Sequence, residues 1–277
     1  MSADCRLAIA RTYESAQTDT LTAGAIREVC ARGYRACIHT LIHDIVVTSH
    51  DSTDQNASVR LKMWNDERIV ALNPGTTLPA ESIIPVFRSD GSGTTFVFTD
   101  YLTKVSPMWK EKFGAGKSVN FPSGQAAKGN PGVAGVIKQT KNSIGYVGSE
   151  YAFAQKIAYA KIKNQHGEIV EPTAASISAA ASGEIPADTR CSITNSDAAG
   201  AYPISTFTWM IIYKEQNYSD RSKEQAVATL DLLQYILSDE AQNITSEVHY
   251  APLPAKAKEL SMKNLKTVTF DGVAILQ

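Results

Sequence analysis

From residue 61 onward, the apolar positions follow two periods, one typical of buried strands and one typical of amphipathic helices. Short apolar runs bounded by turn residues predict strands, and the stretch SVNFPSG is expected to be a strand that runs into a loop. These predicted strands are IIPVF (83–87), SVNFPSG (118–124), SIGYVG (143–148) and TFTWMIIYK (206–214).

Helices are predicted between these strands. Apolar residues repeat at three and four positions from Thr94 to Phe113, where Pro107 would either kink one helix or begin a second. In 130–140, Asn130 and the proline after it suit an N-cap and a first helical turn. Two further helices are expected at YAFAQKI (151–157) and, opened by Ser222, at SKEQAVATLDLLQYILSDEAQ (222–242).

Strands that alternate with helices in this way indicate an α/β sandwich. The segment EPTAASISAAASGEIPAD (171–188) is rich in alanine and serine, and it is consistent with either a helix with weak ends or a linker. A chain of 277 residues is long enough for two modest domains, each with its own core.

Residues 1–60 differ in composition from the rest of the chain. They hold six of the ten arginines and none of the seventeen lysines, and their periodicity is poor. Two interpretations compete. The segment is either a divergent piece of the fold or the product of translation in the wrong frame, and translating the coding DNA in its other frames would distinguish them.

Charge and hydropathy argue against several functional classes, among them nucleic-acid-binding and membrane-spanning proteins. The net charge of −1 gives no basic footprint for nucleic acid, and the chain has no run of 18 apolar residues that would span a membrane. The start of the chain has no basic region followed by an apolar run, so no signal peptide is expected. Cys37, His39 and His43 lie close together but fit no common tetrahedral metal pattern, so neither a metal nor another cofactor is expected.

The stretch RSDGSGTT (88–95) carries the most chemical information. It places an arginine, an aspartate, two glycines and hydroxyl residues between a predicted strand and a predicted helix. The first N–H groups of a helix lack intrahelical partners and bind anions, and Arg88 offers a planar fork for two oxygens of an oxyanion. The alternative is an ordinary serine–glycine turn with a helix cap and a solvated arginine.

Other candidate sites are weaker. GAGKS (114–118) resembles the end of an NTP-binding phosphate loop, but it follows a predicted helix, and Gly114 suits a helix C-terminus. No histidine lies near Ser92 in sequence, and no G-x-S-x-G motif occurs, so we expect no enzyme. Residues 66–68 (DER) suit a solvated helix face. We expect Trp64, Trp109 and Trp209 to lie in the core or in a cleft wall rather than to form a stacking platform, and we expect His166 and His249 to be structural or exposed.

Several motifs in order give the chain a family resemblance. The stretches RSDGSGTTFVFTDYLTKV, KGNPGVAGVIKQTKNSIGYVGSEYA, YPISTFTWMIIYK and YAPLPAKAKEL closely resemble the periplasmic phosphate-binding proteins of ABC-type phosphate importers. The resemblance covers about residues 61–277 and leaves 1–60 unmatched. It implies a periplasmic-binding-protein-like α/β fold of two lobes joined by a hinge, with phosphate held between the lobes.

The resemblance also implies roles for particular residues. Arg88 would bind phosphate oxygens, Ser92, Gly93 and Thr94 would donate hydrogen bonds to them, and Asp90 would hold Arg88 in place. The second lobe would occupy 61–201, with 29–60 falling at its start, and 202–277 would return to the first lobe. The first-lobe ligands of the family are a Thr-Phe turn, a serine and an aspartate, and none of them is found in residues 1–60. The first lobe is therefore expected to be incomplete.

The function implied is that of a periplasmic, monomeric receptor that delivers phosphate to the permease subunits of an importer. One alternative is a truncated or miscoded relative that no longer binds the ion. Another is a receptor for a different oxyanion such as sulfate or molybdate. Phosphate affinity, with sulfate as a competitor, discriminates among the three.

Overall fold

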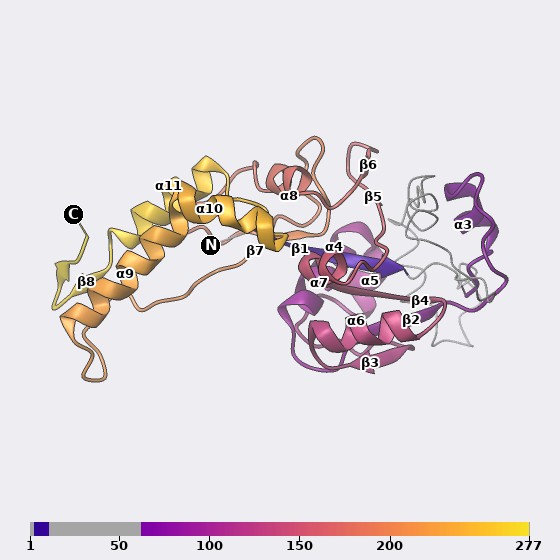
Figure 1. Ribbon diagram of the computed structural model, residues 1–277, viewed down its shortest axis with the longest axis horizontal. Helices are drawn as coiled ribbons and strands as arrows, with labels where there is room; N and C mark the ends of the chain where they lie inside the picture. The colour runs from indigo at the N-terminus through magenta and orange to yellow at the C-terminus, as the bar shows by residue number, and fades with distance from the viewer. Residues whose placement is uncertain (1–2, 11–61, 277) are drawn as a thin grey trace.

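The structure is a computed structural model that describes residues 3–10 and 62–276. The molecule is elongated, with a sheet covered by helices at one end and a helical arm at the other (Figure 1). No helix of the described chain has both the length and the apolarity needed to cross a membrane.

The central feature is a five-stranded sheet with the strand order β3-β2-β4-β1-β7. Strands β2 and β4 are parallel, as are β2 and β3, whereas β1 runs antiparallel to both β4 and β7. The strand bounds are β1 Ala3–Ala10, β2 Ile84–Arg88, β3 Gln125–Ala127, β4 Ser143–Gly148 and β7 Ser205–Phe207. The strands predicted at 83–87 and 143–148 are confirmed, whereas β1 was not predicted.

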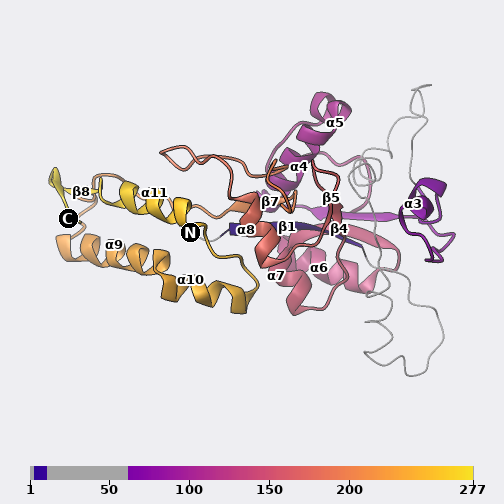
Figure 2. The same cartoon turned by 90° about the horizontal axis from the view of Figure 1, so that it is seen from above.

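Helices cover both faces of the sheet. Figure 2 shows α4 (Gly93–Val105) and α5 (Pro107–Lys112) on one face and α6 (Gly129–Gln139) on the other. This placement follows from right-handed crossovers, because the connection from β2 to β3 and the connection from β3 to β4 run in opposite directions across the sheet. Pro107 begins a second helix, and the Ser106 hydroxyl before it accepts a hydrogen bond from the N–H of Trp109 at 3.1 Å.

The remaining elements are short connections and the helical arm. They are α3 Glu67–Leu72, α7 Ser149–Ala154, β5 Ile162–Lys163, β6 Ile169–Val170, α8 Ala174–Ala180, α9 Lys223–Leu237, α10 Asp239–Thr245, a 3₁₀ turn Ser246–Val248, α11 Ala255–Leu265, β8 Thr269–Phe270 and β9 Val273–Ala274. Residues 171–188 were consistent with either a helix or a linker. The segment contains the helix α8, which begins with a capping box at Thr173 and Ser176.

Three sequence predictions are corrected at element boundaries. The predicted strand 118–124 is irregular, and the pairing with β2 comes after it at β3. The predicted helix 222–242 breaks at Ser238, which has an extended backbone and caps α10 with its hydroxyl. Asn130 is not an N-cap, because α6 already begins at Gly129.

The fourth correction concerns 206–214, predicted as one long strand. Only Ser205–Phe207 forms a strand, because β1 pairs with that part alone, and the apolar residues after it have no neighbouring strand in the described chain. Backbone pairing with another segment, rather than β-propensity, decides where a strand ends.

The main core lies between the sheet and its helices. Its largest fully buried side chains include Trp109, Tyr101 and Phe98, and Trp64 is also buried. Trp209 differs, since 38% of it is exposed. The arm has a small core of its own around Leu230, Leu233 and Val268.

Candidate functional site

The candidate site lies at the carboxyl ends of the three parallel strands. Strands β2, β3 and β4 end at the same edge of the sheet, and helices α4, α6 and α7 begin within a few residues of those ends. Ligand sites of open α/β sheets form at this edge, because the loops and the helix N-termini meet there. The stretch 88–95 singled out from the sequence joins β2 to α4 at this edge.

The start of α4 is closely capped. Ser92 is the N-cap, and its Oγ accepts hydrogen bonds from the N–H groups of Thr94 at 3.0 Å and Thr95 at 3.2 Å. Only 3% of Ser92 is exposed. Its own N–H donates to the carbonyl of Lys117 at 2.8 Å, so the GAGKS segment supports this loop. The first helical N–H, that of Gly93, has no acceptor among the described residues.

Arg88 is held by Asp90. The Arg88 Nε donates to Asp90 Oδ1 at 2.8 Å, and Nη2 donates to Oδ2 at 2.6 Å, which is the two-pronged geometry of a strong pair. Asp90 Oδ1 also accepts from the N–H of Gly129 at 3.0 Å. The Arg88 guanidinium, followed by the Gly129 N–H, holds the pKa of the Asp90 carboxyl well below its usual range. Asp90 therefore stays ionised and fixes Arg88 to the start of α6.

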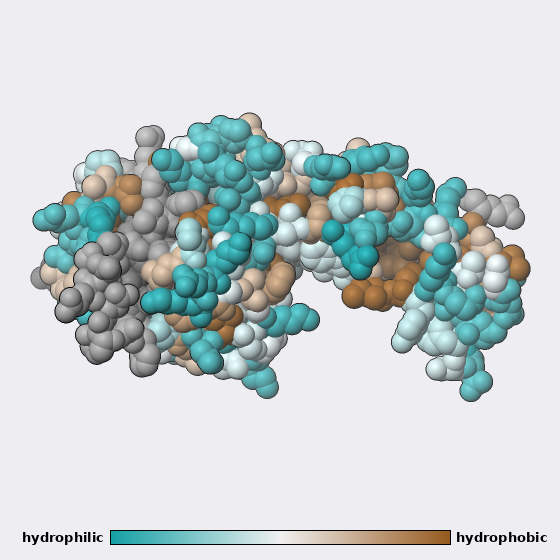
Figure 3. Space-filling model, turned by 180° about the vertical axis from the view of Figure 1, so that it is seen from behind, coloured by the Kyte–Doolittle hydropathy of each residue, from teal (hydrophilic) through white to brown (hydrophobic). Residues whose placement is uncertain are grey.

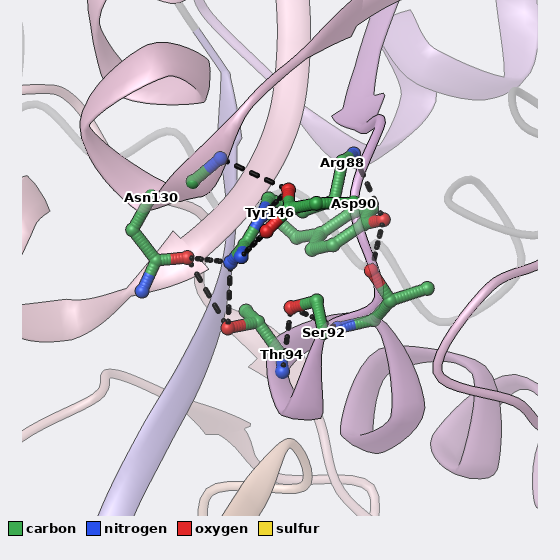
Figure 4. Close-up of polar contacts among 8 residues, drawn as sticks. Arg88, Asp90, Ser92, Thr94, Asn130 and Tyr146 are labelled. Atoms are coloured by element: carbon green, nitrogen blue, oxygen red, sulfur yellow. Dashed lines mark hydrogen bonds and ion pairs between the residues drawn. The ribbon is translucent and has the colours of Figure 1, made fainter.

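Asn130 holds the other side of the guanidinium (Figure 4). Its Oδ1 accepts from Arg88 Nη1 at 2.8 Å and from the Thr94 hydroxyl at 3.2 Å. An arginine has five N–H donors. Asp90 accepts from two of them, Asn130 accepts from a third, and Thr94 Oγ1 accepts a longer bond from Nη1 at 3.4 Å, which leaves one Nη2 N–H without an acceptor among the described residues. The guanidinium is thus fixed in place and retains donor capacity for a ligand.

Tyr146 on β4 fixes the corner between β2 and α4. Its hydroxyl accepts from the N–H of Arg88 at 3.3 Å and lies 2.9 Å from the Thr95 hydroxyl. Its ring stacks on Phe98, with ring centroids 4.5 Å apart. Burial raises the pKa of Tyr146, so the phenol is neutral at physiological pH. Tyr146 therefore acts as a buried support beneath the loop.

The structure brings together the residues expected from the sequence. Arg88 and Asp90 form the predicted ion pair, and Ser92, Gly93 and Thr94 stand at the start of α4. Sequence reasoning missed Asn130 and Tyr146 as members of the cluster. Asn130 was noted only as a helix cap, and an asparagine beside the end of a parallel strand was the available signal.

Apart from the Lys117 carbonyl, which accepts from the N–H of Ser92, the weaker candidates do not join this cluster. The GAGKS segment follows α5, and Gly114 ends that helix with a φ of 67°. One ring nitrogen of His166 lies 2.5 Å from the carbonyl of Asp197, and His249 ends a 3₁₀ turn. Asp66 caps α3 and pairs with Arg68. The described residues contain no cluster suited to a metal, and the Cys37, His39 and His43 candidate lies outside them.

Comparison with known proteins places the chain in a family. The profile of the PBP superfamily domain matches residues 20–240. The chain belongs to the PBP superfamily. The match reaches back to residue 20, so it includes part of the segment that was set apart by composition.

Curated relatives are similar to this chain over most of its length. The "Phosphate-binding protein PstS" of Xylella fastidiosa (strain Temecula1) is 42% identical over 198 residues, which are 70% of this chain and 53% of the relative. The protein of the same name from Haemophilus influenzae is 39% identical over 211 residues, 75% of this chain and 62% of the relative. The chain thus spans about half to three-fifths of the length of these relatives.

Solved structures support the fold. A high-affinity periplasmic phosphate-binding protein (PfluDING), solved with phosphate bound, has a TM-score of 0.60 at 21% identity, covering 93% of this chain and 68% of that one. A phosphate-binding protein from Stenotrophomonas maltophilia has a TM-score of 0.55 at 15% identity, covering 99% and 71%. The two-lobe α/β class expected from the sequence is confirmed at the level of the fold.

Proposed function

We propose that the chain binds inorganic phosphate at the 88–94 loop and delivers it, in the periplasm, to the permease subunits of an ABC-type importer. The observation that carries the proposal is the Arg88 guanidinium, which is held by Asp90, Asn130 and Thr94 at the start of α4 and still has an Nη2 N–H to offer. The names of the curated relatives support the choice of phosphate.

Binding at this loop depends on directed hydrogen bonds more than on net charge, because Asp90 already balances the charge of Arg88. Arg88 would donate to two phosphate oxygens, one from the remaining Nη2 N–H and one from the Nη1 N–H that now donates to Thr94. The Gly93 N–H, at the positive end of the helix dipole, would donate to a third. The Ser92 hydroxyl accepts from two N–H groups and keeps its own proton for the ligand. When phosphate binds, the Thr94 hydroxyl would donate its hydrogen bond to a phosphate oxygen instead of to Asn130 Oδ1.

Asp90 would also contribute to selectivity. Its Oδ2 accepts only from Arg88 Nη2 in the described chain, so it has a lone pair for another donor. Hydrogen phosphate can supply an O–H to that lone pair, whereas fully ionised sulfate cannot. A preference for phosphate over sulfate follows from this arrangement.

We place this loop in the second lobe, within 61–201, and assign 202–277 to the return of the chain to the first lobe. In the described residues the loop forms one wall of a phosphate site, and the first-lobe ligands that form the facing wall in the family are not found in residues 1–60. A one-walled site stays hydrated, so each hydrogen bond contributes less than it would in a closed cleft.

Isothermal titration of the purified chain with phosphate at low salt, with sulfate in parallel, tests the proposed function. The proposal predicts saturable heat from phosphate and much less from sulfate. A phosphate-dependent rise in Tm would give independent support. No heat from either ion, or equal weak heat from both, would contradict it and favour a relative that has lost the ion-binding function.

Substituting Asn130 by aspartate separates the role of this residue in binding from its role in folding. Aspartate keeps the acceptor for Arg88 and Thr94, so the free energy of unfolding should change little. Because Asp90 already balances Arg88, the added carboxylate would make the cluster net negative and repel the anion, so we expect phosphate affinity to fall about tenfold or more.

The matched control for this substitution is Asn243→Asp, which adds the same charge at an exposed position of α10. Titration and urea unfolding of both variants provide the readouts. Equal phosphate affinity in the Asn130→Asp variant and the unmodified chain would remove Asn130 from the site.

A further inference from the structure

A neighbouring segment supports the 88–94 loop from outside. This segment is Gly114–Ser118, here called the brace, and its sequence is GAGKS. The carbonyl of Lys117 in the brace accepts from the N–H of Ser92 at 2.8 Å. The brace does not form a phosphate loop of its own, but its backbone reaches the N-cap of α4 and so bears on the candidate site.

The brace is attached through its backbone rather than through its side chains. Ala115, Lys117 and Ser118 are exposed. A Cβ placed on Gly91 would lie 3.8 Å from the Ser118 hydroxyl oxygen, so the loop and the brace run side by side. On the face seen in Figure 3, hydrophilic residues cover much of the sheet end, whereas a hydrophobic patch lies in the concave region beside the arm. Because the brace buries little apolar surface, hydrogen bonds hold it in place.

Thr99 of α4 provides the central attachment of the brace. Its side chain is fully buried, and its Oγ1 accepts from the N–H of Gly116 at 3.1 Å. The same hydroxyl donates within the helix to the carbonyl of Thr95 at 2.8 Å and lies 3.3 Å from the carbonyl of Gly116. A hydroxyl has one proton and two lone pairs, so it can serve the helix and the brace at once. Thr99 thus joins the brace to the second turn of the helix that begins at the loop.

The first residue of the brace is fixed as well. The indole N–H of Trp109 donates to the carbonyl of Gly114 at 2.9 Å, and the N–H of Gly114 donates to the carbonyl of Trp109 at 3.0 Å. Farther along the brace, a Cβ on Gly116 would lie only 3.1 Å from the carbonyl oxygen of Ser118, so a glycine suits this close approach. Since Gly116 directly precedes Lys117, its position sets the position of the Lys117 carbonyl.

We propose that Thr99 is a positioning residue for phosphate binding, because its hydroxyl places the brace that holds Ser92. The inference rests on the proposed function of the 88–94 loop. The hydroxyl fixes Gly116, and the next carbonyl along the brace accepts from Ser92. Thr99 itself is fully buried in the second turn of α4 and acts on the ion only through these contacts.

Ser92 needs this support because glycines flank it. Gly91 and Gly93 belong to the residue type with the greatest backbone freedom. Without the brace, the unbound loop would sample more conformations and would lose more conformational entropy when it binds phosphate. A displaced Ser92 would also turn its hydroxyl and the Gly93 N–H away from the ion. Phosphate affinity therefore depends on a hydroxyl that does not contact the ion.

Two substitutions of Thr99 separate its hydroxyl from its packing. Thr99→Val keeps the shape of the side chain and removes the hydroxyl, whereas Thr99→Ser keeps the hydroxyl and removes a buried methyl group. Both should lower the free energy of unfolding, measured with urea. Only Thr99→Val should weaken phosphate binding, by about tenfold in isothermal titration, because only this variant releases Gly116.

Thr103→Val is the matched control. Thr103 lies one turn farther along α4, and its hydroxyl donates to the carbonyl of Asp100 at 2.7 Å. Among the described residues it makes no hydrogen bond with the brace, so Thr103→Val should leave phosphate affinity unchanged. The inference is overturned if Thr99→Val binds phosphate as tightly as the unmodified chain. It is also overturned if Thr99→Ser weakens binding as much as Thr99→Val, because the effect would then follow packing.

Hydrogen exchange without phosphate, resolved by residue with NMR, tests the brace independently of binding. The Ser92 amide should exchange at least about fivefold faster in Thr99→Val, because its bond to the Lys117 carbonyl opens more often. Thr99→Ser and Thr103→Val should exchange as the unmodified chain does. Unchanged Ser92 exchange in Thr99→Val would overturn the inference. Absence of phosphate binding by the unmodified chain would instead overturn the proposed function, and Ser92 exchange would still decide whether Thr99 positions the loop.

Discussion

Replacing Arg88 by alanine is expected to weaken phosphate binding at least about a hundredfold, because hydrogen bonds to charged groups contribute roughly 1.5–3 kcal/mol each. Arg88 would supply two such bonds. Its removal also leaves the Asp90 carboxylate without its cation, so the remaining charge would repel the anion. Isothermal titration measures the loss.

A second arginine provides the control for this substitution. Arg190 pairs with Asp188 at 2.8 Å, again two residues apart, but its side chain is 83% exposed and lies outside the 88–94 loop. Arg190→Ala should leave phosphate affinity unchanged. If Arg88→Ala and the unmodified chain bind phosphate equally well, the site lies elsewhere.

Replacing Trp109 by alanine is expected to lower the free energy of unfolding by about 3–5 kcal/mol, the usual cost of removing a large buried aromatic side chain. Trp109 is fully buried, and its indole N–H donates to the carbonyl of Gly114 at 2.9 Å. Its ring contacts Phe113 and Phe121. The substitution leaves a cavity and an unpaired carbonyl at the end of α5.

Met108 is the control for this core position, because it is the preceding residue on the same helix and is exposed. Met108→Ala should cost less than about 1 kcal/mol. Urea unfolding of both variants measures the difference. A loss below about 1 kcal/mol for Trp109→Ala would contradict the packing described for this helix pair.

Local features of the fold could be read from the sequence. The strand, the glycine turn and the helix start at 84–95 were predicted because propensity, capping and apolar period agree there. Pro107 was recognised as a helix start or kink for the same reason. At Ser238 the apolar period continued through the break, so the sequence predicted one helix where the chain forms two.

Pairing between distant segments could not be read in the same way. The residues 206–214 have the composition of a strand throughout, yet among the described residues only the first part pairs with a neighbouring strand. A strand needs backbone partners from elsewhere in the chain, and periodicity carries no information about where those partners stop.

The residues of the candidate site fall into the same two groups, those that are close in sequence and those that only the fold brings together. The sequence by itself determined that Arg88, Asp90, Ser92 and Thr94 stand together, because all four lie within one turn between a strand and a helix. Only the tertiary structure brought Asn130 to the guanidinium and Tyr146 beneath the loop, since they come from a helix and a strand far along the chain. The physical reason is the parallel sheet, which aligns the ends of β2, β3 and β4 at one edge.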